Sequence, residues 1–331
     1  MTSTTPTQHD GDQHGDTQHR DTQHRGTQHG DTQHGDTQHG GELTAGSVSS
    51  ADGTQIGYLR LGRGPAVVLL HGSNESARSH LQLARALAGE FTVYLPDRRG
   101  RGLSGPHRPG HGMATEVEDL RAVLAQSGAQ RVFGVSAGGL IALETARTGA
   151  DIRKLALYEP ALLRAQDAAR YTSWVTRFDQ EMAAGDVPAA LITSMYGLDL
   201  APPAFRLLPR RALEFLTSLA LRSEDKKAAS DAVTMRQLAP TLRYEGVLLG
   251  EMAGRADTFA AVAADVLLMA GSKGLAFLRP GLDALAQTLP HSRRVTFAGL
   301  DHGGSSDPGP ANRHGRPAVV APEIRAFFTG P

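Results

Sequence analysis

From Glu42 onward, short apolar runs alternate with longer stretches of helical periodicity. The runs are rich in Val, Leu, Tyr and Phe and predict eight strands, over residues 46–50, 54–60, 66–70, 91–95, 131–135, 154–158, 266–270 and 294–298. The stretches with helical periodicity between them predict covering helices over residues 77–89, 115–127 and 138–148. This alternation predicts an α/β fold, a mostly parallel eight-stranded sheet flanked by helices, with an opening hairpin formed by the first two strands.

One long stretch interrupts the alternation. Residues 161–263, between the sixth and seventh predicted strands, have helical periodicity and no convincing strand. We therefore expect a helical cap inserted after the sixth strand over one edge of the sheet, with the core formed by residues 42–160 and 264–331. The larger apolar side chains of the cap either line a substrate pocket or pack within the cap itself. They include Met195, Tyr196, Phe205 and Phe215.

The first forty-one residues differ in composition from the rest of the chain. Residues 1–41 repeat a five-residue unit, seen cleanly as DTQHG at 31–35 and 36–40, that places a histidine at a constant interval. Almost no apolar side chain is available there to offset the entropy of ordering, so we expect a disordered tail. A histidine-rich tract can bind zinc, copper or nickel opportunistically, or it can be a solvated product of repeat expansion. We assign it no part in the chemistry.

Composition narrows the function classes. The 34 basic residues balance the 34 acidic ones, so no net charge attracts the chain to nucleic acid or to an anionic membrane. No apolar run reaches the roughly 18–20 residues of a spanning helix, and the polar start lacks a secretory signal. We expect a cytoplasmic protein with a small-molecule substrate and no cofactor or metal; the oligomeric state is not indicated. The absence of cysteine excludes disulfides, thiolate metal sites and cysteine nucleophiles.

The strongest chemical motif is the pentapeptide Gly134-Val135-Ser136-Ala137-Gly138. It directly follows the predicted strand RVFGV and directly precedes the helical run LIALETAR. This strand–turn–helix setting is the one that a nucleophile elbow requires, with glycines two before and two after the serine to avoid collisions. The alternative is a tight helix start or an anion-binding loop. A dinucleotide site is disfavoured because the spacing is not G-x-G-x-x-G.

Four features in chain order resemble the α/β-hydrolase family, and the likeness runs from about residue 46 to residue 328. They are HGSNES at 71–76, PDRRGRGLSG at 96–105, GVSAGG at 134–139 and LDHGG at 300–304. The resemblance implies a serine hydrolase with Ser136 as the nucleophile. It also implies that PDRRGRGLSG supports the site through its arginines and glycines rather than taking part in the reaction.

An acyl-transfer site also needs donors for the negative charge that develops on the carbonyl oxygen. One is expected to be the amide of Ala137, directly after the nucleophile and at a helix N-terminus. The His-Gly-x pattern of the family places the second on Ser73, with Asn74 as the less favoured substitute. His71 is expected to be structural.

The general base is predicted to be His302. It lies in the glycine-rich loop GLDHGGSSDPG after the last strand, where the family has its catalytic histidine, and imidazole is suited to taking and returning a proton. The other histidines outside the tail and the His71 motif are expected to be solvated, in helices or exposed turns. They are His80, His107, His111, His291 and His314.

The triad acid departs from the common pattern. The resemblance implies an aspartate in the loop after strand 266–270, but Gly274 stands at that position. Glu159, immediately after strand 154–158, is the candidate in its place, as in some members of the family. Alternatives are that Glu159 only terminates its strand and faces solvent, or that a Ser–His dyad works with water. Asp301 and Asp283 are weaker candidates.

Together these residues predict a two-step acyl transfer in which an ester-type bond (carboxylester, lactone or thioester) of a small to medium apolar substrate is cleaved through an acyl-enzyme. Two other interpretations stay open. The same residues serve carbon–carbon bond hydrolysis or cyclisation in some settings, since the fold does not fix the reaction. The third interpretation is a ligand-binding protein without turnover, for which the glycine at position 274 is the one supporting feature.

Overall fold

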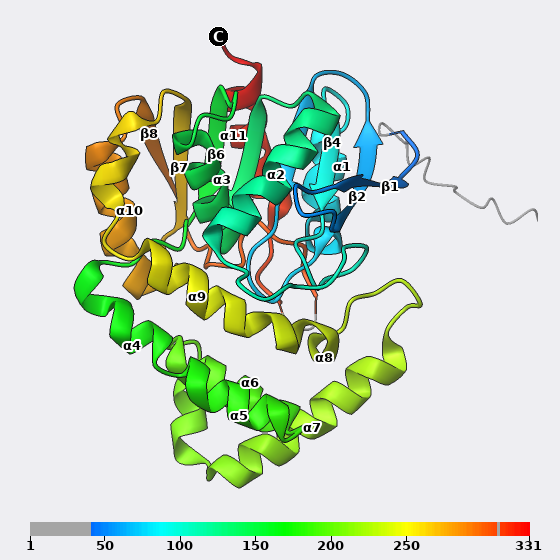
Figure 1. Ribbon diagram of the computed structural model, residues 1–331, viewed down its shortest axis with the longest axis vertical. Helices are drawn as coiled ribbons and strands as arrows, with labels where there is room; N and C mark the ends of the chain where they lie inside the picture. The colour runs from blue at the N-terminus through cyan, green and yellow to red at the C-terminus, as the bar shows by residue number, and fades with distance from the viewer. Residues whose placement is uncertain (1–40, 310–311) are drawn as a thin grey trace, which may run out of the picture. The chain divides into compact units, whose positions relative to one another are not determined.

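A computed structural model describes residues 41–309 and 312–331. The predicted histidine-rich tail, apart from Gly41, lies outside these described residues. Eight strands form a single sheet (Figure 1). Their bounds are β1 Thr44–Ser49, β2 Gln55–Gly62, β3 Ala66–Leu70, β4 Thr92–Pro96, β5 Arg131–Val135, β6 Lys154–Tyr158, β7 Asp265–Gly271 and β8 Ser292–Phe297.

The strand order across the sheet is β1-β2-β4-β3-β5-β6-β7-β8. β2 pairs antiparallel with both β1 and β4, whereas the remaining neighbours pair in parallel. Each strand begins and ends within two residues of its predicted bounds. The predicted fold class, α/β with a mostly parallel eight-stranded sheet flanked by helices, is confirmed.

Helices cover both faces of the sheet because alternate residues of the central strands point to opposite sides. On β3, Val68 and Leu70 pack with one cluster of buried side chains, and Val67 and Leu69 pack with the other. The helices over the first cluster are α2 Met113–Ser127, α3 Ala137–Arg147 and α10 Arg279–Thr288, joined by one end of α9 Leu242–Met252. The helices over the second are α1 Leu81–Leu87 and α11 Pro317–Thr329.

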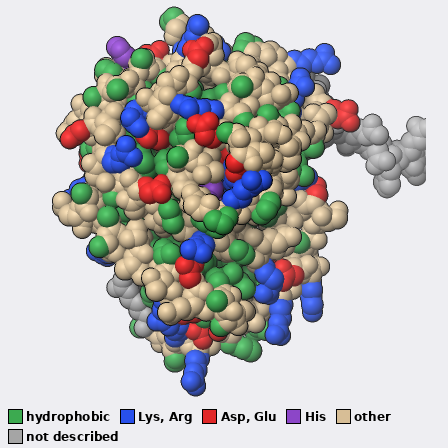
Figure 2. Space-filling view, viewed as in Figure 1, with side chains coloured by type: hydrophobic (Ala, Val, Ile, Leu, Met, Phe, Trp, Pro, Cys, Tyr) green, Lys and Arg blue, Asp and Glu red, His purple; other side chains and the backbone are tan. Residues whose placement is uncertain are grey.

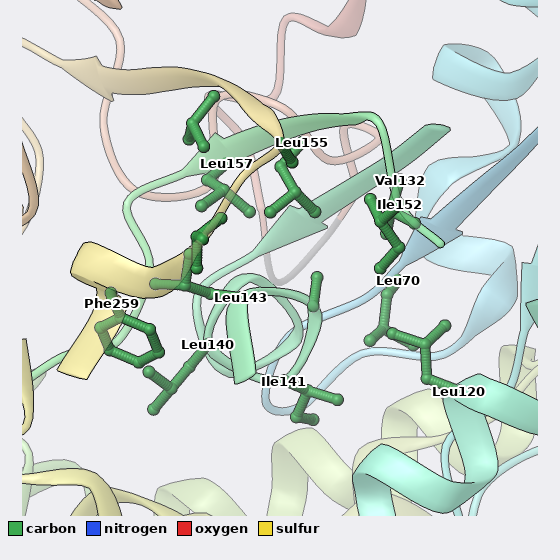
Figure 3. Close-up of a cluster of buried hydrophobic side chains, with 14 of the residues drawn as sticks. Leu70, Leu120, Val132, Leu140, Ile141, Leu143, Ile152, Leu155, Leu157 and Phe259 are labelled. Carbon is green, nitrogen blue, oxygen red and sulfur yellow. The ribbon is translucent and has the colours of Figure 1, made fainter. Parts of the chain in front are cut away.

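The helix that follows the β5 turn is packed on the first face along its whole length. Leu140, Ile141 and Leu143 of α3 are at most 1% exposed and lie among leucine and valine side chains of the central strands (Figure 3). Burial of large apolar side chains contributes about 1.5–3 kcal/mol each. The start of α3 is therefore held rigidly against the sheet.

Between β6 and β7 the chain forms helices, and none of the described residues there forms a strand. We call these helices the insertion helices. They are α4 Ala168–Thr172, α5 Val175–Ala183, α6 Val187–Gly197, α7 Arg210–Lys227, α8 Met235–Leu238 and α9 Leu242–Met252. Figure 1 shows α9 running beneath the carboxyl ends of the parallel strands, with α5, α6 and α7 farther from the sheet. The proposed division into core and cap at residues 161 and 263 stays a prediction.

On the face that Figure 2 shows, basic and acidic side chains are interspersed, in keeping with the balanced composition. Within the part of the chain that the structure describes, no helix combines the length and the apolar character needed to cross a membrane.

Candidate active site

Ser136 occupies a sharp turn between β5 and α3. Its φ of 53° and ψ of −121° are unusual for a residue other than glycine, and such strain is typical of functional turns. The turn is held because the Ser136 amide donates to the Tyr158 carbonyl of β6 (3.0 Å) and the Ser136 carbonyl accepts from Leu140 of α3 (3.1 Å). A Cβ on Gly134 would lie 2.6 Å from the Gly138 carbonyl oxygen, so these glycines allow the backbones to approach. This geometry is that of a nucleophile elbow.

His302, in the loop after β8, and Glu159, directly after β6, are in contact. The Nδ1 atom of His302 lies 2.7 Å from Glu159 Oε2. The Glu159 side chain is only 4% exposed, so the alternative in which its carboxylate faces solvent does not fit. Two backbone amides, of Gly271 (3.0 Å) and Leu275 (3.2 Å), also donate to this carboxylate. These contacts position the Glu159 carboxyl group against one nitrogen of the ring.

Gly274 explains why Glu159 can lie there. A Cβ added to Gly274 would collide with Glu159 Oε1 and lie 2.7 Å from Oε2. The Glu159 carboxylate therefore fills the space into which a side chain at position 274 would project. A side chain at position 274 and the carboxylate of Glu159 cannot occupy this space together.

The Ser136 and His302 side chains line one cavity of about 130 Å³. Among the hydrogen bonds of the described residues, none joins Ser136 Oγ to the His302 ring, and such bonds are often long before substrate binds. The remaining wall is mostly apolar. It includes Val135, Leu140, Ala161, Leu198, Leu200, Leu248, Leu249, Leu275, Phe277 and Leu278.

The four cap residues considered for the substrate wall are not among the residues that line this cavity. Phe215 is 63% exposed and Tyr196 is 38% exposed, on the outside of the insertion helices. Of the two interpretations, the one in which these side chains line the substrate pocket does not fit this cavity, because helical periodicity identifies an apolar side chain but not the neighbour it faces. Leucines of α9 and of the segment after α6 form the wall in their place.

Both predicted oxyanion donors lie at the cavity. Ser73 and Ala137 line it, and neither of their amides takes part in a hydrogen bond recorded for the described residues. The loop that carries Ser73 packs closely on Ser136, since a Cβ on Gly72 would lie 3.1 Å from Ser136 Cβ. Two free amides beside a strained serine form a geometry that can receive an oxyanion.

His71 is structural, as expected. It is fully buried, its Nδ1 lies 2.8 Å from the Gly72 carbonyl oxygen, and its Nε2 accepts a hydrogen bond from the Arg98 amide (3.1 Å). Burial and the nearby cations of Arg101 and Arg98 hold the pKa of His71 well below its usual range. A neutral imidazole here links the loop after β3 to the loop after β4.

The prediction that the other histidines are solvated was wrong for two of them. His80 is 1% exposed and lies 3.2 Å from Glu75, and His111 is 6% exposed and lies 3.1 Å from Glu116. Both imidazoles are buried because a carboxylate partner offsets the loss of water. Sequence periodicity gave no signal for either partner.

The loop after β4 anchors the insertion helices. Arg98 donates to Glu116 of α2 (2.7 Å) and to Glu245 of α9 (3.0 Å), and Arg101 also contacts Glu245. Arg98, Glu116 and Glu245 are each about 2% exposed. Burial opposes the charge of Arg98, but Glu116 and Glu245 raise its pKa above the usual value. Since Glu245 also lines the cavity, this buried ion cluster anchors α9 beside the cavity that Ser136 lines.

We expect Arg98→Met to lower the free energy of unfolding by about 3–5 kcal/mol, because it leaves two buried carboxylates with too little positive charge. Urea denaturation followed by circular dichroism measures this change. The matched control is Arg121→Met, which removes a half-exposed partner of Glu118 and should cost less than about 1 kcal/mol. Equal, small losses in both variants would contradict the anchoring role.

Sequence reasoning missed two charged residues at the site, Glu75 and Glu245. Glu75 lies in the quoted HGSNES segment, and its position three residues after Gly72 was an available signal for a carboxylate that accepts from a loop amide. No local signal marks Glu245, since its partners lie more than 140 residues away.

Comparison with known proteins finds relatives that match most of the described residues. Residues 67–322 match the model of the "Alpha/beta hydrolase family". A pimeloyl-[acyl-carrier protein] methyl ester esterase of Xanthomonas axonopodis pv. citri is 27% identical over 245 residues, which are 73% of this chain and 89% of that protein.

Two solved structures give the same result. An alpha/beta hydrolase from Sphaerobacter thermophilus has a TM-score of 0.68 and 30% identity and covers 86% of this chain and 100% of its own. A thermophilic esterase from Thermogutta terrifontis has a TM-score of 0.59 and 18% identity, and covers 86% of this chain and 98% of its own. The second likeness is one of fold alone.

Proposed function

Since the chain belongs to the alpha/beta hydrolase family and is an ester-hydrolysing enzyme, we propose that it cleaves a carboxylic ester. The reaction would pass through an acyl-enzyme on Ser136. The observation that carries the proposal is the contact of 2.7 Å between Glu159 Oε2 and Nδ1 of His302, which lines the same cavity as the strained Ser136 turn. A carboxylate on Nδ1 fixes the tautomer whose free Nε2 accepts the serine proton.

The first half of the reaction transfers the acyl group. His302 Nε2 takes the proton of Ser136 Oγ while the oxygen attacks the ester carbonyl carbon, and the carbonyl oxygen becomes an anion. The amides of Ser73 and Ala137 bind that anion. As the tetrahedral intermediate collapses, the bond to the alkoxy oxygen breaks and His302 returns the proton to it, so the alcohol leaves and the acyl group stays on Ser136.

The second half repeats these steps with water as the nucleophile. His302 removes one water proton, the hydroxyl attacks the acyl carbon, and the bond to Ser136 Oγ breaks as the proton returns to that oxygen. Glu159 holds the ring in place and stabilises the imidazolium that forms on His302. The products are a carboxylic acid and the free enzyme.

The size and apolar lining of the cavity favour a substrate with a small or medium-sized apolar acyl group. Its volume of about 130 Å³ is close to that of an engineered apolar cavity of about 150 Å³ that holds one benzene molecule. The related esterase from Xanthomonas acts on a methyl ester of an acyl-carrier-protein substrate, as its name states, which supports ester hydrolysis here. The contact between Glu159 and His302 offers a carboxylate despite the glycine at position 274, and so supports turnover over a binding protein.

We expect kcat/KM for p-nitrophenyl esters to be highest for acyl chains of up to about six carbons and to fall about tenfold or more by ten carbons, because the longer chain overfills the cavity. The Leu249→Ala variant removes a wall residue of α9 and should move the optimum to longer chains. Steady-state kinetics across the ester series measures both effects.

The matched control for this series is Leu216→Ala, which changes a leucine of α7 that is 51% exposed and does not line the cavity. It should leave the chain-length profile unchanged. A β-diketone and a lactone of similar size belong in the same panel. Turnover of the β-diketone without turnover of any ester would reject the proposed reaction in favour of carbon–carbon bond hydrolysis.

A further inference from the structure

Glu75 is a mostly buried carboxylate that the reaction above does not use. Its side chain is 19% exposed and borders the same cavity as Ser136. Three donors from three parts of the chain converge on it. The Gly72 amide donates to Oε2 (2.7 Å), the Ser306 hydroxyl donates to Oε1, and His80 Nε2 lies 3.2 Å from Oε2.

Two of these donors belong to the loops on either side of the reacting atoms. Gly72 is the residue before Ser73, and Ser306 lies four residues after His302 in the same loop. We propose that Glu75 is a positioning residue that ties these two loops together and so holds the Ser73 amide and the His302 ring at a fixed separation across the cavity. This inference rests on the proposed function of the site.

The charge of Glu75 needs a partner, because a bare carboxylate beside a developing oxyanion would oppose it. Burial alone would raise the pKa of the Glu75 carboxyl, but the His80 cation and the three hydrogen bonds lower it to about 2. Burial also disfavours the cation of His80, yet Glu75 raises the pKa of that imidazole above its usual value. The pair is therefore close to neutral, and Glu75 serves to orient rather than to repel.

The position of the loop matters because an oxyanion donor acts only when it points at the place where the charge develops. Gly72 packs closely against Ser136, since a Cβ placed on Gly72 would lie only 3.1 Å from Ser136 Cβ. Asn74, on the other side of Ser73, has a φ of 54° that the surrounding contacts must hold. A loop that is released at Glu75 can relax this strain and carry the Ser73 amide away.

The test is Glu75→Gln, which keeps the size of the side chain but removes its charge. We expect kcat for a short p-nitrophenyl ester to fall about 10- to 100-fold while KM changes less than about threefold, as for a misplaced donor that acts in the transition state. A short alkylboronic acid forms a tetrahedral adduct with a serine, so its inhibition constant should rise by the same factor as kcat/KM falls.

The matched control is Glu144→Gln, since Glu144 is also a buried, ion-paired carboxylate, 2.6 Å from Arg147 on α3, but does not line the cavity. It should retain kcat and boronate affinity whatever its stability. Ser306→Ala removes the hydrogen bond that joins the loop of His302 to Glu75. If Glu75 acts by joining the loops, the double variant Glu75→Gln/Ser306→Ala should lose no more activity than Glu75→Gln alone.

Multiplicative losses in the double variant, or an unchanged boronate affinity in Glu75→Gln, would overturn the positioning role. A loss of kcat that follows the unfolded fraction measured by circular dichroism would also overturn it, in favour of a purely structural role. An active wild-type protein with a fully active Glu75→Gln variant refutes only this inference. A wild-type protein that hydrolyses no ester and binds no boronate refutes the proposed function together with it.

Discussion

Ser136→Ala is expected to lower kcat for ester hydrolysis by about 10⁴-fold or more and to abolish labelling by a fluorophosphonate probe. The loss is large because the variant has no oxygen to form the acyl-enzyme, and only the amides of the oxyanion site and substrate binding remain. Labelling followed by mass spectrometry of the peptide that contains position 136 measures the covalent step separately from turnover.

The fold should survive this change. Alanine at position 136 keeps the backbone contacts to Tyr158 and Leu140, and it replaces a serine that already adopts a positive φ. Ser173→Ala, at an exposed serine between α4 and α5, is the control and should label and turn over as the wild type does. A Ser136→Ala protein that still hydrolyses esters at more than about a tenth of the normal rate would reject the nucleophile.

The residues that the sequence could predict are those identified by a motif of neighbouring residues in the chain. Ser136 is identified by the strand before it, the helix after it and the glycines around it, all within a dozen residues. The strands followed from short apolar runs, because burial on both faces requires continuous apolar sequence. His302 was identified by its glycine-rich loop after the last strand, which places it at the same edge of the sheet.

The residues that sequence could not predict depend on contacts between distant segments. Glu245 pairs with Arg98 across 147 positions, and Ser306 donates to Glu75 across 231 positions. Neither pair has a periodicity or a motif that links its members. The same reason explains why the insertion leucines at the cavity were not separated from Tyr196 and Phe215, which face outward.

Glu159 lies between these two cases. The glycine at position 274 indicated that the acid had to come from elsewhere, and the end of β6 offered a carboxylate at the correct edge. Sequence alone could not exclude a solvent-facing side chain, because that depends on the backbone of Glu159 itself. Its φ of 44° turns the side chain back toward His302, a conformation that its amide contact with the Met269 carbonyl (2.9 Å) helps to hold.

The second large effect is expected at this acid. Glu159→Gln should lower kcat more than tenfold, because the amide cannot stabilise the imidazolium and can offer an N–H where Nδ1 needs an acceptor. The pH dependence and the magnitude of kcat for a short p-nitrophenyl ester measure the loss. Near-normal activity in this variant would reject Glu159 and leave a Ser–His dyad with water.

The collision between a side chain at 274 and the Glu159 carboxylate allows a sharper test, since one acid can be moved between the two positions. Gly274→Asp alone should be poorly active, because two carboxylates cannot share the space and their like charges repel. Glu159→Gly combined with Gly274→Asp relieves the positive φ at 159, frees the space and returns a carboxylate to within reach of His302 Nδ1. We expect the double variant to exceed both Gly274→Asp and Glu159→Gln in kcat by about tenfold. A double variant no better than Glu159→Gln, although folded by circular dichroism, would show that a carboxylate at position 274 cannot take over the contact that Glu159 makes with His302.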